Sequence, residues 1–245
     1  MPRFFINIDE RQDNTLFVSG DDARHIARSM RMAVGDEITL CSNDGFEYLC
    51  RLTRIRDDRC DCEIIEYGKG KSEPPYSLTL FMAYPKSDKL ETVIQKAVEL
   101  GATEIVPFVS SRCIKRPDEK RSEARLERLN RIAEEAAKQC GRTMLPKVSL
   151  PISFDEMLAS AKKSELSLFC YEGKCAKSLK AALEEIQGIP KSVCAIVGSE
   201  GGFSPEEVQK TEESGITSVT LGERILRCET APSYVLSAIS YKFEL

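Results

Sequence analysis

The sequence contains no tryptophan, one histidine (His25) and no Cys-x-x-Cys pair. Its ten cysteines are scattered, and the closest two, Cys60 and Cys62, are separated by a single residue. A structural zinc site needs about four Cys or His ligands at defined spacings, so we expect no metal in this protein. The spacing also suggests no disulfide framework, and we interpret the cysteines as reduced thiols of a cytoplasmic protein.

Long apolar runs are missing as well. No segment approaches the roughly 18 uninterrupted apolar residues of a membrane-spanning helix, and residues 1–10 become acidic before an apolar run of signal-peptide length. We therefore expect neither a membrane partner nor secretion. The 245 residues are 42% hydrophobic and 30% charged, which suffices for a packed core in one large domain or two smaller ones.

The net charge of −4 argues against a nucleic-acid partner, but the charge is unevenly distributed. Residues 112–147 hold eleven Lys or Arg and six Asp or Glu, a local net charge of +5, which leaves −9 for the rest of the chain. Such a region fits an electrostatic footprint for phosphates. It also fits a solvated helix face with alternating charges, and the sequence leaves both interpretations open.

The first seventy residues predict a small β-barrel. Five short segments are rich in β-branched, aromatic or cysteine residues and are separated by turn signals. They are Phe4–Ile8, Thr15–Val18, Glu37–Cys41, Glu47–Ile55 and Cys60–Ile65. Asn43-Asp44-Gly45 predicts a hairpin between the third and the fourth. One helix is expected over about Asp21–Arg31, with Asp21 as its N-cap.

A Gly- and Pro-rich segment at residues 68–75 predicts a boundary between domains of residues 1–72 and 73–245. Beyond it, strand and helix patterns alternate, which predicts an α/β domain with a parallel sheet covered on both faces. The strands are expected at Leu78–Tyr84, Thr103–Val109, Leu166–Tyr171, Val193–Val197 and Ser218–Leu221. The helices are expected at Asp88–Leu100, Asp118–Cys140, Phe154–Lys163, Ala176–Ile186 and Pro232–Phe243, with one more after the capping box Ser204-Pro205-Glu206-Glu207.

Two loops lie where a parallel sheet binds its ligands, at the carboxyl ends of strands. The first, residues 198–204, has three glycines that permit close approach of a ligand, and it precedes a helix N-terminus that suits an anion. Glu200 in this loop instead favours a hydroxyl, an amine or a cation. The loop matches neither G-x-G-x-x-G nor G-x-x-x-x-G-K-[ST], and a tight turn without a ligand remains an alternative.

The second loop, residues 221–231, keeps Ile225 and Leu226 among charged neighbours. Apolar residues in such a loop are typically buried or line a pocket. Arg227 and Glu229 would then lie beside an apolar wall, and Thr230 is the expected N-cap of the last helix. A salt-bridged surface loop is the alternative.

Blocks spread over nearly the whole chain resemble the ribosomal RNA small-subunit methyltransferase E family, which belongs to the SPOUT group. They are His25–Arg31 followed by Gly35-Asp36, Lys86 followed by Ile94–Gly101, Ser111-Arg112, Glu135–Arg142, Gly198–Phe203 and Leu221–Ala231. Two positions depart from the family pattern. Ser199 replaces a proline, which makes that turn less rigid, and Met30 replaces a leucine with similar volume.

The resemblance implies a fold, a cofactor and a substrate. The fold would be an N-terminal PUA-like RNA-binding β-barrel followed by a SPOUT α/β domain with a C-terminal trefoil knot. The protein would be a homodimer. It would use S-adenosylmethionine to methylate ring nitrogen N3 of one uridine in the 16S ribosomal RNA of the small ribosomal subunit.

The resemblance also implies site residues. Candidates for the cofactor pocket are Cys170, Gly198, Glu200, Gly201, Leu221, Gly222, Ile225, Leu226 and Arg227. Arg227 would stabilise the uridine anion, and a structural pair with Glu229 is the alternative. Glu229 would be a base, an orienting group, or a structural residue with a helix-capping or hydrogen-bonding role. Candidates for RNA contacts are Arg28, Arg31, Arg112, Gln139 and Arg142. His25 lies in the RNA-binding domain, where we expect it to pack within the helix rather than act as a base.

Two other functions compete with this one. A non-catalytic RNA-binding assembly factor would not need Arg227 or Glu229, so their presence disfavours it. A nucleotide-phosphate-binding enzyme would need a lysine in the glycine-rich loop, and Glu200 stands against it.

Overall fold

The computed structural model describes residues 1–6, 14–86, 89–117, 122–173 and 177–245. The predicted ends of segments at Ile8, Asp88, Asp118 and Ala176 lie outside these residues. The chain forms two compact units. Unit 1 comprises Met1–Glu73 and Ala137–Leu145, and unit 2 comprises Pro74–Ala136 and Pro146–Leu245. The boundary after Glu73 lies one residue from the predicted one. We did not predict that residues 137–145, which follow in the second part of the chain, belong to unit 1.

Unit 1 is built on a five-stranded sheet, ordered β1-β3-β4-β5-β2. Its strands are β1 (Arg3–Phe5), β2 (Thr15–Ser19), β3 (Glu37–Cys41), β4 (Phe46–Ile55) and β5 (Arg59–Lys69). β1 pairs in parallel with β3 and the other pairs are antiparallel. Among the described residues the outer strands β1 and β2 do not pair, so the sheet forms a half-barrel where the sequence predicted a small barrel. The β3–β4 hairpin confirms the predicted turn, where Asn43 and Gly45 both have positive φ.

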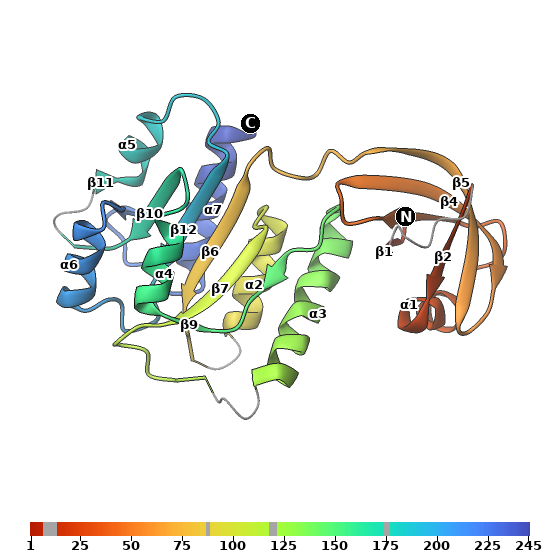
Figure 1. Cartoon of the computed structure of the whole chain (residues 1–245), viewed down its shortest axis with the longest axis horizontal. Coiled ribbons are helices and arrows are strands. Elements are labelled where there is room, and N and C mark those ends of the chain that lie inside the picture. The colour runs from red at the N-terminus through yellow and green to blue at the C-terminus, as the bar shows by residue number, and fades with distance from the viewer. Residues whose placement is uncertain (7–13, 87–88, 118–121, 174–176) are drawn as a thin grey trace. The chain divides into compact units, whose positions relative to one another are not determined.

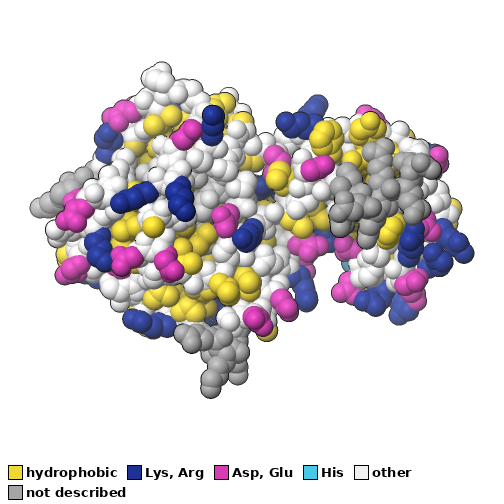
Figure 2. Space-filling model, in the orientation of Figure 1, with side chains coloured by type: hydrophobic (Ala, Val, Ile, Leu, Met, Phe, Trp, Pro, Cys, Tyr) yellow, Lys and Arg dark blue, Asp and Glu magenta, His cyan; other side chains and the backbone are white. Residues whose placement is uncertain are grey.

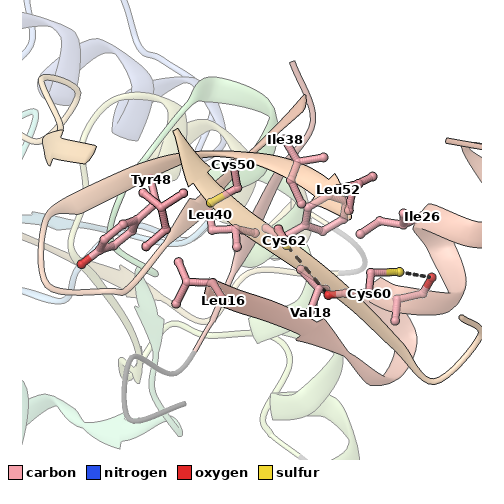
Figure 3. Close-up of a cluster of buried hydrophobic side chains, with 13 residues drawn as sticks. Leu16, Val18, Ile26, Ile38, Leu40, Tyr48, Cys50, Leu52, Cys60 and Cys62 are labelled. Atoms are coloured by element: carbon pink, nitrogen blue, oxygen red, sulfur yellow. Dashed lines mark hydrogen bonds between the residues drawn. The ribbon is translucent and has the colours of Figure 1, made fainter. Parts of the chain in front are cut away.

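The core of unit 1 comes from alternate residues of its strands, which point to one face of the sheet. Figure 3 shows Leu40, Cys50 and Leu52 in this cluster beside Cys60 and Cys62. Burial raises the pKa of the Cys50 and Cys62 thiols to about 12, so both stay protonated. All cysteines among the described residues are free, in agreement with the interpretation as core thiols.

The helix of unit 1 begins one residue earlier than its predicted N-cap. Helix α1 (Gly20–Arg24) continues into a π-helical turn, η2 (His25–Ser29), and its N-cap position is Ser19 rather than Asp21. The expectation that His25 packs within the helix is wrong, since His25 is exposed and Ile26 enters the core. Arg31 follows with a φ of 52°, a left-handed conformation that is uncommon outside glycine.

The segment Ala137–Leu145 is held within unit 1 by a buried ion pair. The Arg142 side chain is 3% exposed, and its Nη2 lies 2.6 Å from Glu73 Oε2. The other carboxylate oxygen of Glu73 accepts hydrogen bonds from the backbone N–H groups of Thr143 and Met144 at 2.7 and 3.1 Å. Leu145 N–H donates to the Asn43 side chain at 2.6 Å. These contacts make the segment an integral part of unit 1.

Unit 2 contains an eight-stranded sheet whose pairs are all parallel, as predicted. The strand order is β11-β13-β10-β12-β6-β7-β8, and β9 also pairs with β7. The strands are β6 (Ser77–Ala83), β7 (Glu104–Val109), β8 (Lys147–Val148), β9 (Ile152–Ser153), β10 (Leu166–Cys170), β11 (Lys177–Ser178), β12 (Ser192–Val197) and β13 (Thr217–Thr220). The two-residue strands β8, β9 and β11 are too short to leave a sequence pattern, and we did not predict them.

Helices cover both faces of this sheet, with α4 on one face and α7 on the other in Figure 1. They are α2 (Lys89–Glu99), α3 (Ser122–Cys140, whose last turn belongs to unit 1), α4 (Phe154–Ala161), α5 (Leu179–Glu184), α6 (Pro205–Glu213) and α7 (Thr230–Phe243). α2 buries one apolar face, and the predicted capping box at Ser204 is present. The buried residues of α2 are Leu90, Val93, Ile94, Ala97 and Val98. Thr230 is the first residue of α7 and not its N-cap, a position that Glu229 occupies without a capping hydrogen bond. Within the described part of the chain, no helix combines the length and apolarity that a bilayer span requires.

Candidate functional site

The loops that follow β10, β12 and β13 meet around one cavity of unit 2. These three strands are neighbours in the sheet and all run parallel, so their carboxyl ends gather at one edge. The cavity has a volume of about 400 Å³. Both of the predicted loops, residues 198–204 and 221–231, contribute to its lining. The structure thus brings together the two loops that the sequence singled out.

Eight of the nine candidate cofactor residues line this cavity: Cys170, Gly198, Glu200, Leu221, Gly222, Ile225, Leu226 and Arg227. The ninth, Gly201, is not part of the lining. A Cβ at Gly201 would lie 2.7 Å from the backbone oxygen of Arg112, so this glycine permits close packing against another loop. Lys89, Tyr171, Glu172, Ser199, Phe203 and Arg224 also line the cavity and were not predicted.

The glycine-rich loop turns back on itself and has little room for side chains. A Cβ at Gly198 would lie 3.1 Å from the Phe203 ring, and Gly202 has a φ of 62°. Gly202 N–H donates to the Ser199 carbonyl at 3.0 Å. Phe203 anchors the end of the loop, since its buried ring lies 4.3 Å from that of Phe169. The packing of Phe203 therefore holds the end of the glycine-rich loop in place beside the cavity.

Lys89, in the first turn of α2, connects the two loops. Its Nζ lies 3.1 Å from Glu200 Oε1 and 3.2 Å from Glu229 Oε2. Hydrogen bonds to Glu200 and then to Glu229 raise the pKa of Lys89. Desolvation opposes ionisation of both carboxylates, but hydrogen bonds from their own backbone N–H groups and from Lys89 outweigh it and lower the pKa of each. All three groups are therefore charged at neutral pH.

Lys89 was missed because its partners are more than 100 residues away in the sequence. The one local signal is its position just after β6, at the carboxyl edge of the sheet where ligands bind. Glu200 is further fixed by the Lys86 backbone N–H, which donates to its Oε1 at 3.3 Å.

Cys228 is a second hydrogen-bond partner of Glu229. Its thiol donates to Glu229 Oε2 at 3.2 Å, and the Lys89 ammonium lies 3.7 Å from its sulfur. Desolvation, and then the hydrogen bond to the carboxylate, raise the pKa of Cys228 to about 12, so the thiol stays protonated. Glu229 thus accepts from two side chains as a stable carboxylate.

The apolar residues of the second loop both line the cavity, as expected of residues that are buried or line a pocket. Leu226 is half-buried, whereas Ile225 is 89% exposed. Arg227 is exposed and also lines the cavity, which leaves its guanidinium accessible to a ligand.

The candidate RNA contacts divide into exposed and buried residues. Arg28, Arg31 and Gln139 are exposed in unit 1, and Arg28 pairs with Asp57. Arg112 is exposed in unit 2, where its Nη1 lies 3.4 Å from the Gly201 carbonyl oxygen. Arg142 is buried in its pair with Glu73, so its side chain has a structural role instead of the predicted surface role.

Part of the basic region is paired with carboxylates that lie outside it in the sequence. These are Arg128 with Glu91, Lys138 with Asp22 and Arg142 with Glu73. In Figure 2 the cationic and anionic side chains are interspersed on the visible face of each unit. The local charge of +5 is therefore partly balanced by carboxylates from outside the region. Arg142 is buried in its pair, whereas Arg128 stays exposed beside Glu91.

Comparison with known proteins identifies relatives over the full length of the chain. Residues 72–240 match the RNA methyltransferase domain family, and residues 18–65 match the RNA methyltransferase PUA domain family. The chain is similar to ribosomal RNA small subunit methyltransferase E of Bacillus subtilis (strain 168), with 38% identity covering 100% of this chain and 98% of the relative. It is also similar to the protein of that name from Mesomycoplasma hyopneumoniae (strain 232), with 35% identity covering 97% and 98%.

A solved structure agrees with this relationship. It is the crystal structure of a ribosomal RNA small subunit methyltransferase E from Neisseria gonorrhoeae bound to S-adenosylmethionine. The similarity covers 99% of this chain and 98% of that chain, with a TM-score of 0.86 and 32% identity.

Proposed function

The chain belongs to the ribosomal RNA small subunit methyltransferase E family of RNA methyltransferases, and from this premise we propose that it methylates ring nitrogen N3 of one uridine in 16S ribosomal RNA. The methyl donor is S-adenosylmethionine, the substrate is carried by the small ribosomal subunit, and the reaction takes place in the cytoplasm. The observation that carries the proposal is the single cavity formed by the two loops after β12 and β13.

The residues around this cavity fit the donor. A volume of about 400 Å³ lies in the range of small-molecule sites. Gly198 and Gly222 allow backbone approach, and Leu226 offers an apolar surface for an adenine ring. S-adenosylmethionine supplies a methyl group on a positively charged sulfur. The carboxylate of Glu200 would repel a phosphate. It is compatible with such a cation or with a ribose hydroxyl.

Arg227 is the proposed catalytic residue on the RNA side. N3 of uridine carries a weakly acidic proton, which must leave before or during attack on the methyl carbon. A guanidinium beside the ring stabilises the negative charge that this loss creates. Arg227 is suited to the role because it is exposed and lines the cavity.

Glu229 is proposed to orient the site rather than to act as the base. A base needs a pKa near the working pH, whereas Lys89 and Cys228 hold the pKa of Glu229 below its ordinary value. Glu229 instead holds Lys89, which in turn fixes Glu200 in the other loop. The two loops then keep the shape that the donor and the uridine require.

RNA contacts are proposed for Arg112 beside the site and for Arg28, Arg31 and Gln139 in unit 1. All four are exposed, and arginines of this kind bind phosphates and unpaired bases. The π-helical turn before Arg31 and its left-handed backbone are features often found at functional sites. Arg142 is not carried forward as an RNA contact, because it is buried.

We also propose a homodimer and a knotted chain. The last helix leaves Tyr234 and Tyr241 exposed, and Ile225 adds a third apolar side chain, which suits a surface covered by a second copy. The knot is proposed from the resemblance to the SPOUT group, and it would involve the C-terminal part of the chain. β13 lies beyond β10 from β12, yet α7, which follows β13, returns to pack against β12 and α2.

Mass mapping of 16S ribosomal RNA tests the function directly. Unmodified RNA and small ribosomal subunits are incubated with the protein and labelled S-adenosylmethionine, and the modified nucleotide is located and identified. The expected product is one N3-methyluridine. A methyl group on another atom would refute the stated target, binding without transfer would favour an assembly factor, and binding of ATP alone would favour a nucleotide-phosphate enzyme.

A further inference from the structure

The glycine-rich loop has two sides with different neighbours. Gly198 and Gly202 line the cavity, whereas Gly201 between them faces the turn that follows β7. On this second side, a Cβ at Gly201 would lie 2.7 Å from the Arg112 backbone oxygen and 3.0 Å from its Cβ. The proposed cofactor loop and the proposed RNA contact Arg112 are therefore packed backbone to backbone, with no space for any side chain.

A buried carboxylate connects the same two segments. Glu207, at 6% exposure, uses Oε2 to accept the Ser204 backbone N–H at 2.9 Å, which completes the capping box of α6. Its Oε1 accepts the Ser111 backbone N–H at 2.7 Å. Capping needs only the first of these contacts. The second contact fixes the residue before Arg112 to the end of the glycine-rich loop.

The turn that carries Arg112 is itself closed. Cys113 N–H donates to the Ser110 carbonyl at 3.1 Å, and Ser110 N–H donates back to the buried Cys113 sulfur at 3.3 Å. Movement of the turn is therefore transmitted to the arginine at its tip. The Arg112 guanidinium also returns to the loop, with its Nη1 3.4 Å from the Gly201 carbonyl oxygen.

We propose that Gly201 and Glu207 are positioning residues that couple the cofactor cavity to Arg112, so that the cofactor and RNA bind cooperatively. The inference rests on the proposed function and extends it to the coupling between the cofactor cavity and the RNA-binding turn. Because the loop and the turn are held together by these contacts, a shift of the loop on cofactor binding also shifts the Arg112 turn. The loop arrangement that the cofactor stabilises is then also the arrangement of the turn that binds RNA. Thermodynamic linkage requires that RNA improve cofactor affinity by the same factor.

The experiment measures this factor in the full-length protein from both directions. The dissociation constant of S-adenosylhomocysteine, which has no methyl group to transfer, is measured with and without 16S ribosomal RNA. The dissociation constant of the RNA is measured with and without saturating S-adenosylhomocysteine, and small ribosomal subunits serve as a second RNA probe. For the unmodified protein we expect each ligand to tighten the other at least about five-fold, the lower range of allosteric coupling.

Two variants remove the coupling by different means, and each has a matched control. G201A forces the loop and the Arg112 turn apart, while G68A adds the same methyl group at a glycine with open space and ordinary φ. E207Q disturbs the shared carboxylate, while E156Q makes the same change in the capping box of α4, where the Glu156 carboxylate accepts hydrogen bonds from Ser153. Circular dichroism and the melting temperature establish that each variant is folded.

The expected result is a coupling factor below about two in G201A and E207Q, and the unaltered factor in G68A and E156Q. Factors equal to that of the unmodified protein in both G201A and E207Q would overturn the inference. So would a factor of one in the unmodified protein when each ligand binds alone. If the unmodified protein binds no S-adenosylhomocysteine at all, the proposed function itself fails, and this outcome is distinguishable from a loss of coupling alone.

Discussion

At the scale of single residues, three charged side chains join segments that are far apart in the sequence. Lys89 lies between Glu200 and Glu229, which belong to the two loops of the cavity. Without the ammonium, two carboxylates would face each other across a short distance, and both loops would lose a shared partner. The lysine therefore determines the shape of the site without belonging to either motif.

Replacing Lys89 tests this role. K89M is expected to weaken cofactor binding about ten-fold, because hydrogen bonds to charged groups contribute about 1.5–3 kcal/mol each. Isothermal titration with S-adenosylhomocysteine measures the loss. K96M is the matched control on the same helix, since the exposed Lys96 pairs with Glu99 and neither residue lines the cavity. Equal affinities of K89M and the unmodified protein would show that the contacts of Lys89 with Glu200 and Glu229 are not needed for cofactor binding.

Arg227 is exposed, so its removal should affect chemistry without affecting folding. R227A is expected to reduce the rate of methyl transfer by about 100-fold or more, as for the loss of a group that stabilises transition-state charge. Single-turnover methylation of 16S ribosomal RNA measures the rate, and the melting temperature serves as the control. A variant with the rate of the unmodified protein would remove Arg227 from the mechanism.

Ser199 gives a prediction about stability. Its hydroxyl is buried, and no hydrogen-bond partner for it exists among the described residues. A buried unsatisfied hydroxyl costs about 1–3 kcal/mol, so S199A is expected to raise the free energy of unfolding by about 1 kcal/mol. In a chain of this size that change raises the melting temperature by about 2–4 °C. A lower melting temperature would mean that the hydroxyl has a partner.

At the scale of elements, the sequence predicted those features that repeat within a few residues. The apolar period of α2, the capping box of α6 and the β3–β4 turn are local patterns, and the structure has all three. The position of an N-cap depends on the exact residue at which a helix begins, so the N-cap predictions at Asp21 and Thr230 were wrong. The two-residue strands and the partners of Lys89, Gly201 and Glu207 arise from packing between distant segments, which no local pattern records.

The last turn of α3 and the residues after it depend on the pair between Glu73 and Arg142. Burial alone would raise the pKa of Glu73, but hydrogen bonding and attraction from Arg142, with the backbone N–H groups of Thr143 and Met144, lower it below 4.5. The pair therefore stabilises unit 1 fully above about pH 4.5, and its contribution is lost as the pH falls through the lowered pKa.

E73Q tests the pair at neutral pH. Removing one member of a buried ion pair leaves an uncompensated charge, and we expect a loss of about 3 kcal/mol in unit 1. Hydrogen exchange measured by mass spectrometry should show lost protection in residues 137–145. E37Q removes a partner from the exposed Arg51 pair and should cost less than about 1 kcal/mol. Equal protection in E73Q and the unmodified protein would contradict the assigned role of Glu73.

At the scale of the whole molecule, an acidic chain carries a basic region of which only a part faces solvent. The net charge is −4. Arg128, Lys138 and Arg142 are paired with carboxylates, and of these three side chains Arg142 is buried, Lys138 is partly buried and Arg128 is exposed. Sequence counting could not separate these from Arg112, because the partners Glu91, Asp22 and Glu73 all lie outside residues 112–147. RNA affinity should therefore depend on a few exposed arginines rather than on the total charge.

The dependence of RNA affinity on salt tests this view. R112A is expected to weaken binding and to lower the slope of log Kd against log salt concentration by about one, as for the loss of one phosphate contact. R128A removes a charge that Glu91 already balances and should leave the slope unchanged. Fluorescence anisotropy at several salt concentrations measures both. If R112A has the same slope as the unmodified protein, Arg112 does not contact an RNA phosphate.

The division of unit 1 between two stretches of chain has a consequence for its synthesis. Its half-barrel sheet lies within the first 73 residues, but it is completed by Ala137–Leu145. A ribosome must therefore translate more than sixty residues of unit 2 before the N-terminal unit has all of its parts. Domains commonly fold one after another as they leave the ribosome. Here unit 1 is the first to be synthesised, but it cannot complete its folding until Ala137–Leu145 has also been synthesised. The nascent chain would expose an incomplete RNA-binding unit until Leu145 has left the exit tunnel.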